Sequence, residues 1–169
     1  MTLEPVRTID ANTANMNGIA IRRATVDDAD TIARHRHAMF RDLGYSDAAA
    51  LDAMRNRFLP WVKAKLNSGD YLAWLAVCEG DLVVAGAGLW LMDWPAHMLG
   101  SSPRRGNILN VYTEPSFRRR GLARRLVEAA LHWCKVNEID LVMLHASDAG
   151  RGLYEELGFR ASNEMRLKL

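Results

Sequence analysis

The sequence predicts a single-domain α/β protein built on a mixed sheet, and three observations lead to this prediction. The 169 residues are 49% hydrophobic and 25% charged, which is typical of one globular domain of ordinary size. A hairpin of apolar strands is expected over residues 71–91. A strand, a helix and a second strand follow over residues 108–144, and this order predicts one parallel, right-handed crossover. We therefore expect antiparallel strands first, a parallel crossover later, and helices on both faces of the sheet.

The first part of the chain predicts a leader, one strand and two helices. Residues 1–18 are polar without a period, so we expect a loose leader before a domain that spans residues 19–169. A first strand is expected at residues 19–23. Thr25 then caps a helix that ends near Gly44. A second helix is expected from Asp47 to about residue 66, with a kink or a break at Pro60.

Several side chains along the chain could be interpreted as functional, and their spacing helps to judge this. His35 and His37 are two residues apart on a helix and do not face each other, so no metal site is predicted. Cys78 and Cys134 form no spacing motif and are interpreted as reduced thiols of a cytoplasmic protein. Four large side chains are open to two readings, as core residues or as the wall of a pocket: Phe40, Tyr45, Met54 and Phe58.

The middle of the chain predicts the hairpin, a long loop and a further strand. Strands at residues 71–78 and 82–91 are joined by a turn that contains Gly80. Residues 92–105 are expected to form a loop, which is either functional or a plain surface excursion. The strand at residues 108–113 ends before Pro115, because proline cannot donate to the hydrogen-bond ladder.

The last third predicts an amphipathic helix, a strand, a short helix and a final strand. Leu122, Leu126, Ala129 and Trp133 recur at three- and four-residue spacing, which indicates one apolar helix face. A strand is expected at residues 139–144. A helix that ends at Gly158 follows, and a final strand is expected within residues 159–169.

A basic turn at residues 118–123 lies between the strand ending at Thr113 and the amphipathic helix. The first amide groups of a helix lack intrahelical partners and attract anions, and phosphate is the ligand expected there. Gly121 lets the backbone approach a ligand closely. The alternative reading is a solvated basic helix start. The motif reads Arg118, Arg119, Arg120, Gly121, Leu122 and Ala123.

This combination resembles the GNAT superfamily of acyl-CoA-dependent N-acyltransferases. The turn is similar to the family's pyrophosphate loop, in which Gln or Arg is followed by two residues, Gly, one residue and Gly or Ala. The segment from Leu153 to Phe159 is similar to the family's Leu-Tyr-x-x-Leu-Gly-Phe signature. The close resemblance covers about residues 106–160, and it implies a GNAT-like mixed sheet.

The resemblance also implies acetyl-CoA as cosubstrate, with no metal. In the family, acyl-CoA lies between two parallel strands that splay apart, and backbone groups there bind the pantetheine arm. Val111 and Thr113 would take this role, and an N–H near Val111 would polarise the thioester carbonyl. The implied cosubstrate contacts are Val111, Tyr112, Thr113, Arg118, Arg119, Arg120, Gly121, Leu122, Ala123, Arg124, Ser147 and Arg151.

The family resemblance implies a general acid for proton transfer but no clear general base. Tyr154 matches the family's tyrosine, which protonates the departing thiolate as a general acid. Some members carry a glutamate early on the strand before the loop, where this chain has Asn107 and Asn110, and neither accepts a proton at neutral pH. The candidates for the general base are Asp93, Glu114, which is expected to face solvent, and His145, each acting directly or through water.

Together these inferences predict an N-acetyltransferase that moves an acetyl group from acetyl-CoA to a primary amine of a small molecule, peptide or protein by direct attack. The alternative is a non-catalytic acyl-CoA-binding regulatory domain. A nucleic-acid module is disfavoured, because the net charge is only +2 and no aromatic residues interleave with the arginines. The sequence has no membrane-spanning run. We expect acetyl-CoA and an amine as partners in the cytoplasm, and a homodimer is left open.

Overall fold

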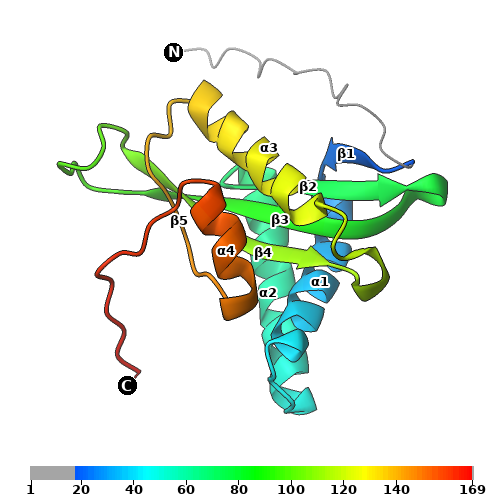
Figure 1. The fold of residues 1–169 in the computed structure, drawn as a ribbon. Coiled ribbons are helices and arrows are strands. Elements are labelled where there is room, and N and C mark those ends of the chain that lie inside the picture. The colour runs from blue at the N-terminus through cyan, green and yellow to red at the C-terminus, as the bar shows by residue number, and fades with distance from the viewer. Residues whose placement is uncertain (1–17, 169) are drawn as a thin grey trace.

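The computed structural model describes residues 18–168, and in this part the chain forms one five-stranded sheet with helices on both faces (Figure 1). The leader predicted at residues 1–18 therefore lies outside the described residues, apart from Gly18. The sheet order is the chain order from β1 to β5. The strands are β1 (Ala20–Arg23), β2 (Tyr71–Cys78), β3 (Leu82–Asp93), β4 (Arg104–Thr113) and β5 (Val142–Leu144). The helices are α1 (Ala29–Asp42), α2 (Ala48–Ser68), α3 (Leu122–Val136) and α4 (Asp148–Glu156).

The first two helices begin at the caps that the sequence predicts. Thr25 and Asp28 form a capping box ahead of α1, and the Asp28 carboxylate accepts a hydrogen bond from the Thr25 N–H at 2.8 Å. The Asp47 side chain accepts a hydrogen bond from the Ala50 N–H at 3.0 Å and caps α2. Pro60 does not end α2, which continues to Ser68 and stops at Gly69 with φ of 75°.

Side chains along β2 point alternately to the two faces of the sheet, and the core therefore has two layers. Tyr71 and Leu75 point to the face that α1 and α2 cover, whereas Trp74 points to the face that α3 covers. Both faces of β2 are buried, which explains its continuous apolar run. Figure 1 shows α3 and α4 together on one face, with α1 and α2 on the other. The mixed α/β fold predicted from the sequence is confirmed.

The lengths of the later strands differ from the prediction. β3 extends to Asp93 and β4 begins at Arg104, so the connecting loop is shorter than expected, at residues 94–103. β5 covers only Val142–Leu144, within the predicted strand at residues 139–144. The predicted final strand is wrong, because residues 159–168 form no strand. A three-residue β5 offers little edge for a further strand to pair with, and Met165 is 93% exposed.

A bulge interrupts β4 halfway along its length. Its register against β3 moves from Leu109 opposite Gly88 to Tyr112 opposite Gly86, so Asn110 and Val111 together face Ala87. Asn110 has a φ of 55°, a left-handed conformation that Asn tolerates better than most residues. The bulge therefore turns Asn110 to the same face as Leu109, toward α1 and α2.

Candidate functional site

The parallel strands β4 and β5 separate at one end. They pair from Gly106 opposite Val142 to Ile108 opposite Leu144, and β5 then ends. β4 continues to Thr113 and keeps pairing with β3 alone. The β5-facing edge of β4 from residue 109 to 113 therefore presents backbone groups to which an extended amide chain can add as a strand.

The N-terminus of α3 lies just beyond this opening along the chain. Gly121 is the N-cap residue with φ of 71°, and no atom lies within 4 Å of the position that a Cβ would occupy. The Arg125 N–H donates to the Gly121 carbonyl at 3.1 Å, which is the first bond of the helix. The N–H groups of Leu122, Ala123 and Arg124 precede that bond and lack intrahelical acceptors. This open helix end suits a phosphate or pyrophosphate.

The arginines of the turn are less available than the sequence suggests. Arg118 pairs with Asp42 of α1 and donates from Nε to the Thr113 carbonyl at 2.9 Å. Arg120 donates to the Ser116 carbonyl at 3.1 Å. Arg124 pairs with Glu156 of α4. Arg119 is exposed and makes no side-chain pair in the described part of the chain, so backbone N–H groups carry most of the anion-binding capacity.

α4 carries the remaining residues predicted from the resemblance. Ser147 caps α4 by accepting a hydrogen bond from the Gly150 N–H at 3.2 Å, and Arg151 is exposed one turn later. Tyr154 is half-buried, and its ring meets Phe159 edge-on at 6.0 Å. Burial raises the pKa of the Tyr154 phenol. Its hydroxyl makes no hydrogen bond within residues 18–168, so it is free to donate to a ligand.

The structure separates the three base candidates. Asp93 is 96% exposed and lies opposite Arg104, at the far end of the hairpin from the Ala85–Thr113 pair. At ~3.4 Å per residue, roughly 25 Å of strand separates the two ends, so Asp93 does not share the site. His145 follows β5 directly, is exposed, and lies 3.3 Å from Glu164.

Glu114, the third candidate, differs from its expected solvent-facing position. Its side chain is 26% exposed, and it accepts hydrogen bonds from Arg34 at 2.6 Å and from the Tyr112 hydroxyl at 3.1 Å. Burial favours the neutral acid, but these hydrogen bonds outweigh it and lower the pKa of Glu114. A carboxylate with a lowered pKa is a weak base, because it holds a captured proton poorly.

A buried histidine lies beside Glu114. His35 Nε2 is 3.7 Å from the Glu114 carboxylate, and the His35 ring packs on Tyr112 at 5.0 Å. Burial, reinforced by the nearby Arg34 charge, lowers the pKa of His35 to about 4. His37 lies instead 3.4 Å from Asp52, so the two histidines have separate surroundings, as their spacing predicts.

The bulge positions a polar group that the sequence analysis did not assign. Asn110 is 4% exposed, its Nδ2 donates to the Tyr71 hydroxyl at 2.8 Å, and its Oδ1 accepts from Arg36 at 2.6 Å. Gly88 leaves room for this arrangement, because a Cβ there would lie 1.9 Å from the Tyr71 hydroxyl. Gly86 and Gly88 are the signal for it in the sequence, because a glycine inside a strand suggests a bulge or a close approach of another group.

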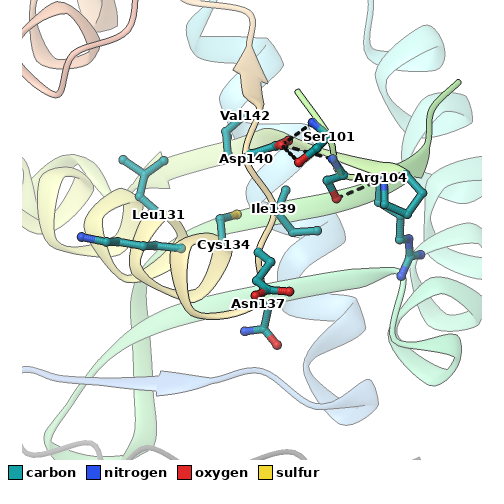
Figure 2. A pocket seen from close by; sticks show the side chains of 12 residues that line it. Ser101, Arg104, Leu131, Cys134, Asn137, Ile139, Asp140 and Val142 are labelled. Atoms are coloured by element: carbon teal, nitrogen blue, oxygen red, sulfur yellow. Dashed lines mark hydrogen bonds between the residues drawn. The ribbon is translucent and has the colours of Figure 1, made fainter. Parts of the chain in front are cut away.

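A hollow of about 900 Å³ lies elsewhere, at the other end of β5 (Figure 2). The Asp140 carboxylate ties loop 94–103 to this region by accepting from the Ser101 N–H at 2.6 Å and the Ser102 N–H at 3.1 Å. Cys134 and Leu131 of α3 line its floor. None of the predicted site residues lies in this hollow, so it is not the candidate active site.

Comparison with known proteins agrees with this geometry. The profile described as "Acetyltransferase (GNAT) family" matches residues 26–159. The chain therefore belongs to the GNAT acetyltransferase family, and the family resemblance found in the sequence is confirmed. No curated protein matches the chain significantly in sequence.

Solved structures are similar over nearly the whole chain. A GCN5-related N-acetyltransferase from Ralstonia eutropha JMP134 is 36% identical, with 90% of this chain and 99% of that chain covered and a TM-score of 0.84. A predicted acetyltransferase from Clostridium acetobutylicum, solved with acetyl-CoA, is 26% identical, with 89% and 95% covered and a TM-score of 0.80. Glucosamine-6-phosphate N-acetyltransferase from Arabidopsis thaliana shares the fold at 17% identity, with 89% and 97% covered and a TM-score of 0.62.

No helix among residues 18–168 is long and apolar enough to cross a membrane. The same residues contain no group of three or more His, Cys, Asp or Glu side chains arranged to hold a metal ion.

Proposed function

We propose that this protein is an N-acetyltransferase that moves an acetyl group from acetyl-CoA to a primary amine by direct attack. The observation that carries the proposal is the coincidence of two openings: β4 and β5 part beyond Ile108, and the uncapped N-terminus of α3 follows in the same crossover. The first opening suits the two amides of a pantetheine arm, and the second suits a pyrophosphate. The acetyl-CoA complex of the Clostridium relative supports the choice of cosubstrate.

The roles of the residues follow from this placement. Backbone groups of Val111 and Thr113 would bind the pantetheine arm, although the Thr113 carbonyl already accepts a hydrogen bond from Arg118. An N–H in the bulge near Val111 would stabilise the negative charge that develops on the thioester oxygen. Tyr154 would hydrogen-bond to the departing sulfur or donate its proton to it, although the pKa of a phenol, ~10, lies above the ~8.5 of a thiolate and full transfer is uphill by about 2 kcal/mol.

No single strong base in this arrangement is placed to remove the amine proton. A lysine-like amine of pKa ~10.4 costs roughly 4–5 kcal/mol to deprotonate at pH 7. Glu114 and His145 remain as acceptors through water, and Glu114 is weakened by its hydrogen bonds. This observation favours the second candidate function, a non-catalytic acyl-CoA-binding domain.

Release of free CoA thiol in the presence of a panel of amines separates the two functions. We expect amine-dependent CoA release that follows Michaelis–Menten kinetics and that Tyr154→Phe slows. Binding of acetyl-CoA without amine-dependent release, across small amines and lysine peptides, would establish the binding-only function instead.

A further inference from the structure

We propose that Arg36 forms an anion subsite on the sheet face that α1 and α2 cover, and that the amine acceptor binds there through a carboxylate or a phosphate group. This inference rests on the proposed acetyltransferase function and names the chemical class of its acceptor. It starts from a guanidinium group in α1 that has no counter-ion among the described residues.

The surroundings of Arg36 are aromatic and neutral. Its Nη1 donates to the Asn110 Oδ1 at 2.6 Å, and its guanidinium carbon lies 4.9 Å from the Phe40 ring centroid and 4.7 Å from that of Phe58. No carboxylate pairs with it among residues 18–168. Glu114, the acidic group of this cluster, is already paired with Arg34. The Arg36 charge is thus unbalanced.

An unbalanced charge at a half-buried position is unfavourable unless a ligand neutralises it. Arg36 is partly buried, and burial lowers its pKa. A buried ion without a partner loses hydration that a neutral amide replaces only in part. A bound anion would replace the hydration that the Arg36 guanidinium loses on burial. A ligand of this kind would explain why an arginine occupies this position.

One nitrogen of the Arg36 guanidinium is free to donate to an oxyanion. Nη1 donates its hydrogen bond to Asn110, whereas Nε is buried without a hydrogen-bond partner. Nη2 makes no hydrogen bond within the described residues and is not fully buried. Nη2 can therefore donate to one oxygen of a carboxylate or a phosphate, whereas the buried Nε has no accessible surface. The flanking Phe40 and Phe58 rings hold the guanidinium plane in place.

Asn110 connects this guanidinium to the proposed reacting centre. Asn110 is the left-handed residue of the β4 bulge, directly before Val111, whose N–H is the proposed donor to the thioester oxygen. The guanidinium is therefore one side chain away from that backbone. This juxtaposition favours a small acceptor that carries its amine and its anion in one molecule.

The test compares pairs of amines that differ only in the anionic group. The pairs are lysine with cadaverine, tyrosine with tyramine, and O-phosphoethanolamine with ethanolamine. We expect kcat/KM for the anionic member of at least one pair to exceed that of its partner by roughly 10- to 100-fold, the ratio for one charge-assisted hydrogen bond. The first two pairs report a carboxylate and the third a phosphate.

Three variants of α1 assign the preference to this side chain. Arg36→Met should abolish it, and because the preference is a ratio within each pair, any loss of turnover that both amines share through Asn110 cancels. Arg36→Lys, which keeps the charge and loses the planar fork, should retain part of it. Arg41→Met changes an exposed arginine on the same helix and should leave it intact. Melting temperatures of all three identify any variant that fails to fold.

The outcomes separate this inference from the function on which it rests. Turnover of amines without preference for an anionic member, or a preference that survives Arg36→Met, overturns the subsite alone. Absence of turnover with every amine overturns the acetyltransferase function. In that case the melting temperature of the CoA-saturated protein decides the subsite: a rise with anionic amines that Arg36→Met removes supports it, and equal values for both proteins overturn it.

Discussion

At the residue scale, the hydroxyl of Tyr154 is the group whose chemistry can be isolated most cleanly. It makes no hydrogen bond within residues 18–168, whereas the ring packs on Phe159. Tyr154→Phe should therefore leave the melting temperature nearly unchanged and lower kcat by roughly 10²-fold, at the low end of the range for general acid catalysis. Steady-state kinetics and thermal unfolding measure the two effects.

The control for this substitution is Tyr45→Phe, which removes a hydroxyl from an exposed tyrosine. An unchanged kcat in Tyr154→Phe, or an equal loss in Tyr45→Phe, would contradict the general-acid role. A large drop in the melting temperature of Tyr154→Phe would indicate a structural role instead.

We expect His35 to make the stability of the fold depend on pH. Its pKa is lowered to about 4 in the folded chain, against ~6.5 in the unfolded chain. Between these values the unfolded state binds more protons, so the free energy of unfolding should fall as pH drops from 6.5 toward 4. For one such proton the slope approaches about 1.4 kcal/mol per pH unit.

Urea unfolding at several values between pH 7 and about pH 5.5 measures this slope above the range where most carboxylates titrate. His35→Gln should flatten the curve, even if it lowers stability at pH 7. His132→Gln, on the exposed face of α3, serves as the matched control and should keep the slope. Parallel curves for the wild type and His35→Gln would show that another group is responsible.

At the element scale, the start of α3 depends on the backbone of one glycine. Gly121 has φ of 71° with no atom within 4 Å of the place where a Cβ would stand, so only the left-handed backbone resists substitution. Gly121→Ala should cost roughly 1–2 kcal/mol of stability and should weaken acetyl-CoA binding by turning the first amide groups of α3 away. Urea unfolding and calorimetric titration with acetyl-CoA measure the two effects.

Gly152 in α4 is the matched control for this substitution. It has the same open surroundings without a positive φ, so Gly152→Ala should stabilise the helix by roughly 0.5–1 kcal/mol. Acetyl-CoA affinity should be unaffected by it. If Gly121→Ala bound acetyl-CoA as tightly as the wild type, the turn would not be the pyrophosphate site.

At the scale of the whole molecule, acetyl-CoA should bind the folded chain and raise its stability by mass action. At a free concentration 100 times Kd, the free energy of unfolding should rise by ~2.7 kcal/mol. For a domain of this size the melting temperature should then increase by roughly 5–10 °C. Differential scanning calorimetry across a concentration series tests this expectation.

Pantetheine, which lacks the pyrophosphate and the nucleotide, is the control ligand. It should shift the melting temperature much less at equal concentration, because the α3 N-terminus then has no anion to bind. Equal shifts for the two ligands would place the binding energy in the β4–β5 opening alone.

Local patterns in the sequence determined most of the elements and the family. Caps at Thr25 and Asp47, the apolar periods of α3 and the hairpin each depend on neighbouring residues, so a linear reading captures them. The turn at residues 118–123 was recognisable for the same reason, since a helix N-terminus and its glycine are contiguous. The final strand was predicted wrongly because a strand also requires an edge to pair with, which no local pattern reports.

Only the tertiary structure decided the surroundings of the site. The bulge at Asn110 reverses the alternation along β4, and a change of one residue in register moves a side chain to the opposite face. For that reason Asn110, Tyr71 and Arg36 meet, although they come from three separate elements. The sequence determined the glycine-containing turn that we propose binds an anion, whereas long-range packing decided which side chains surround Asn110 and which charge remains without a partner among the described residues.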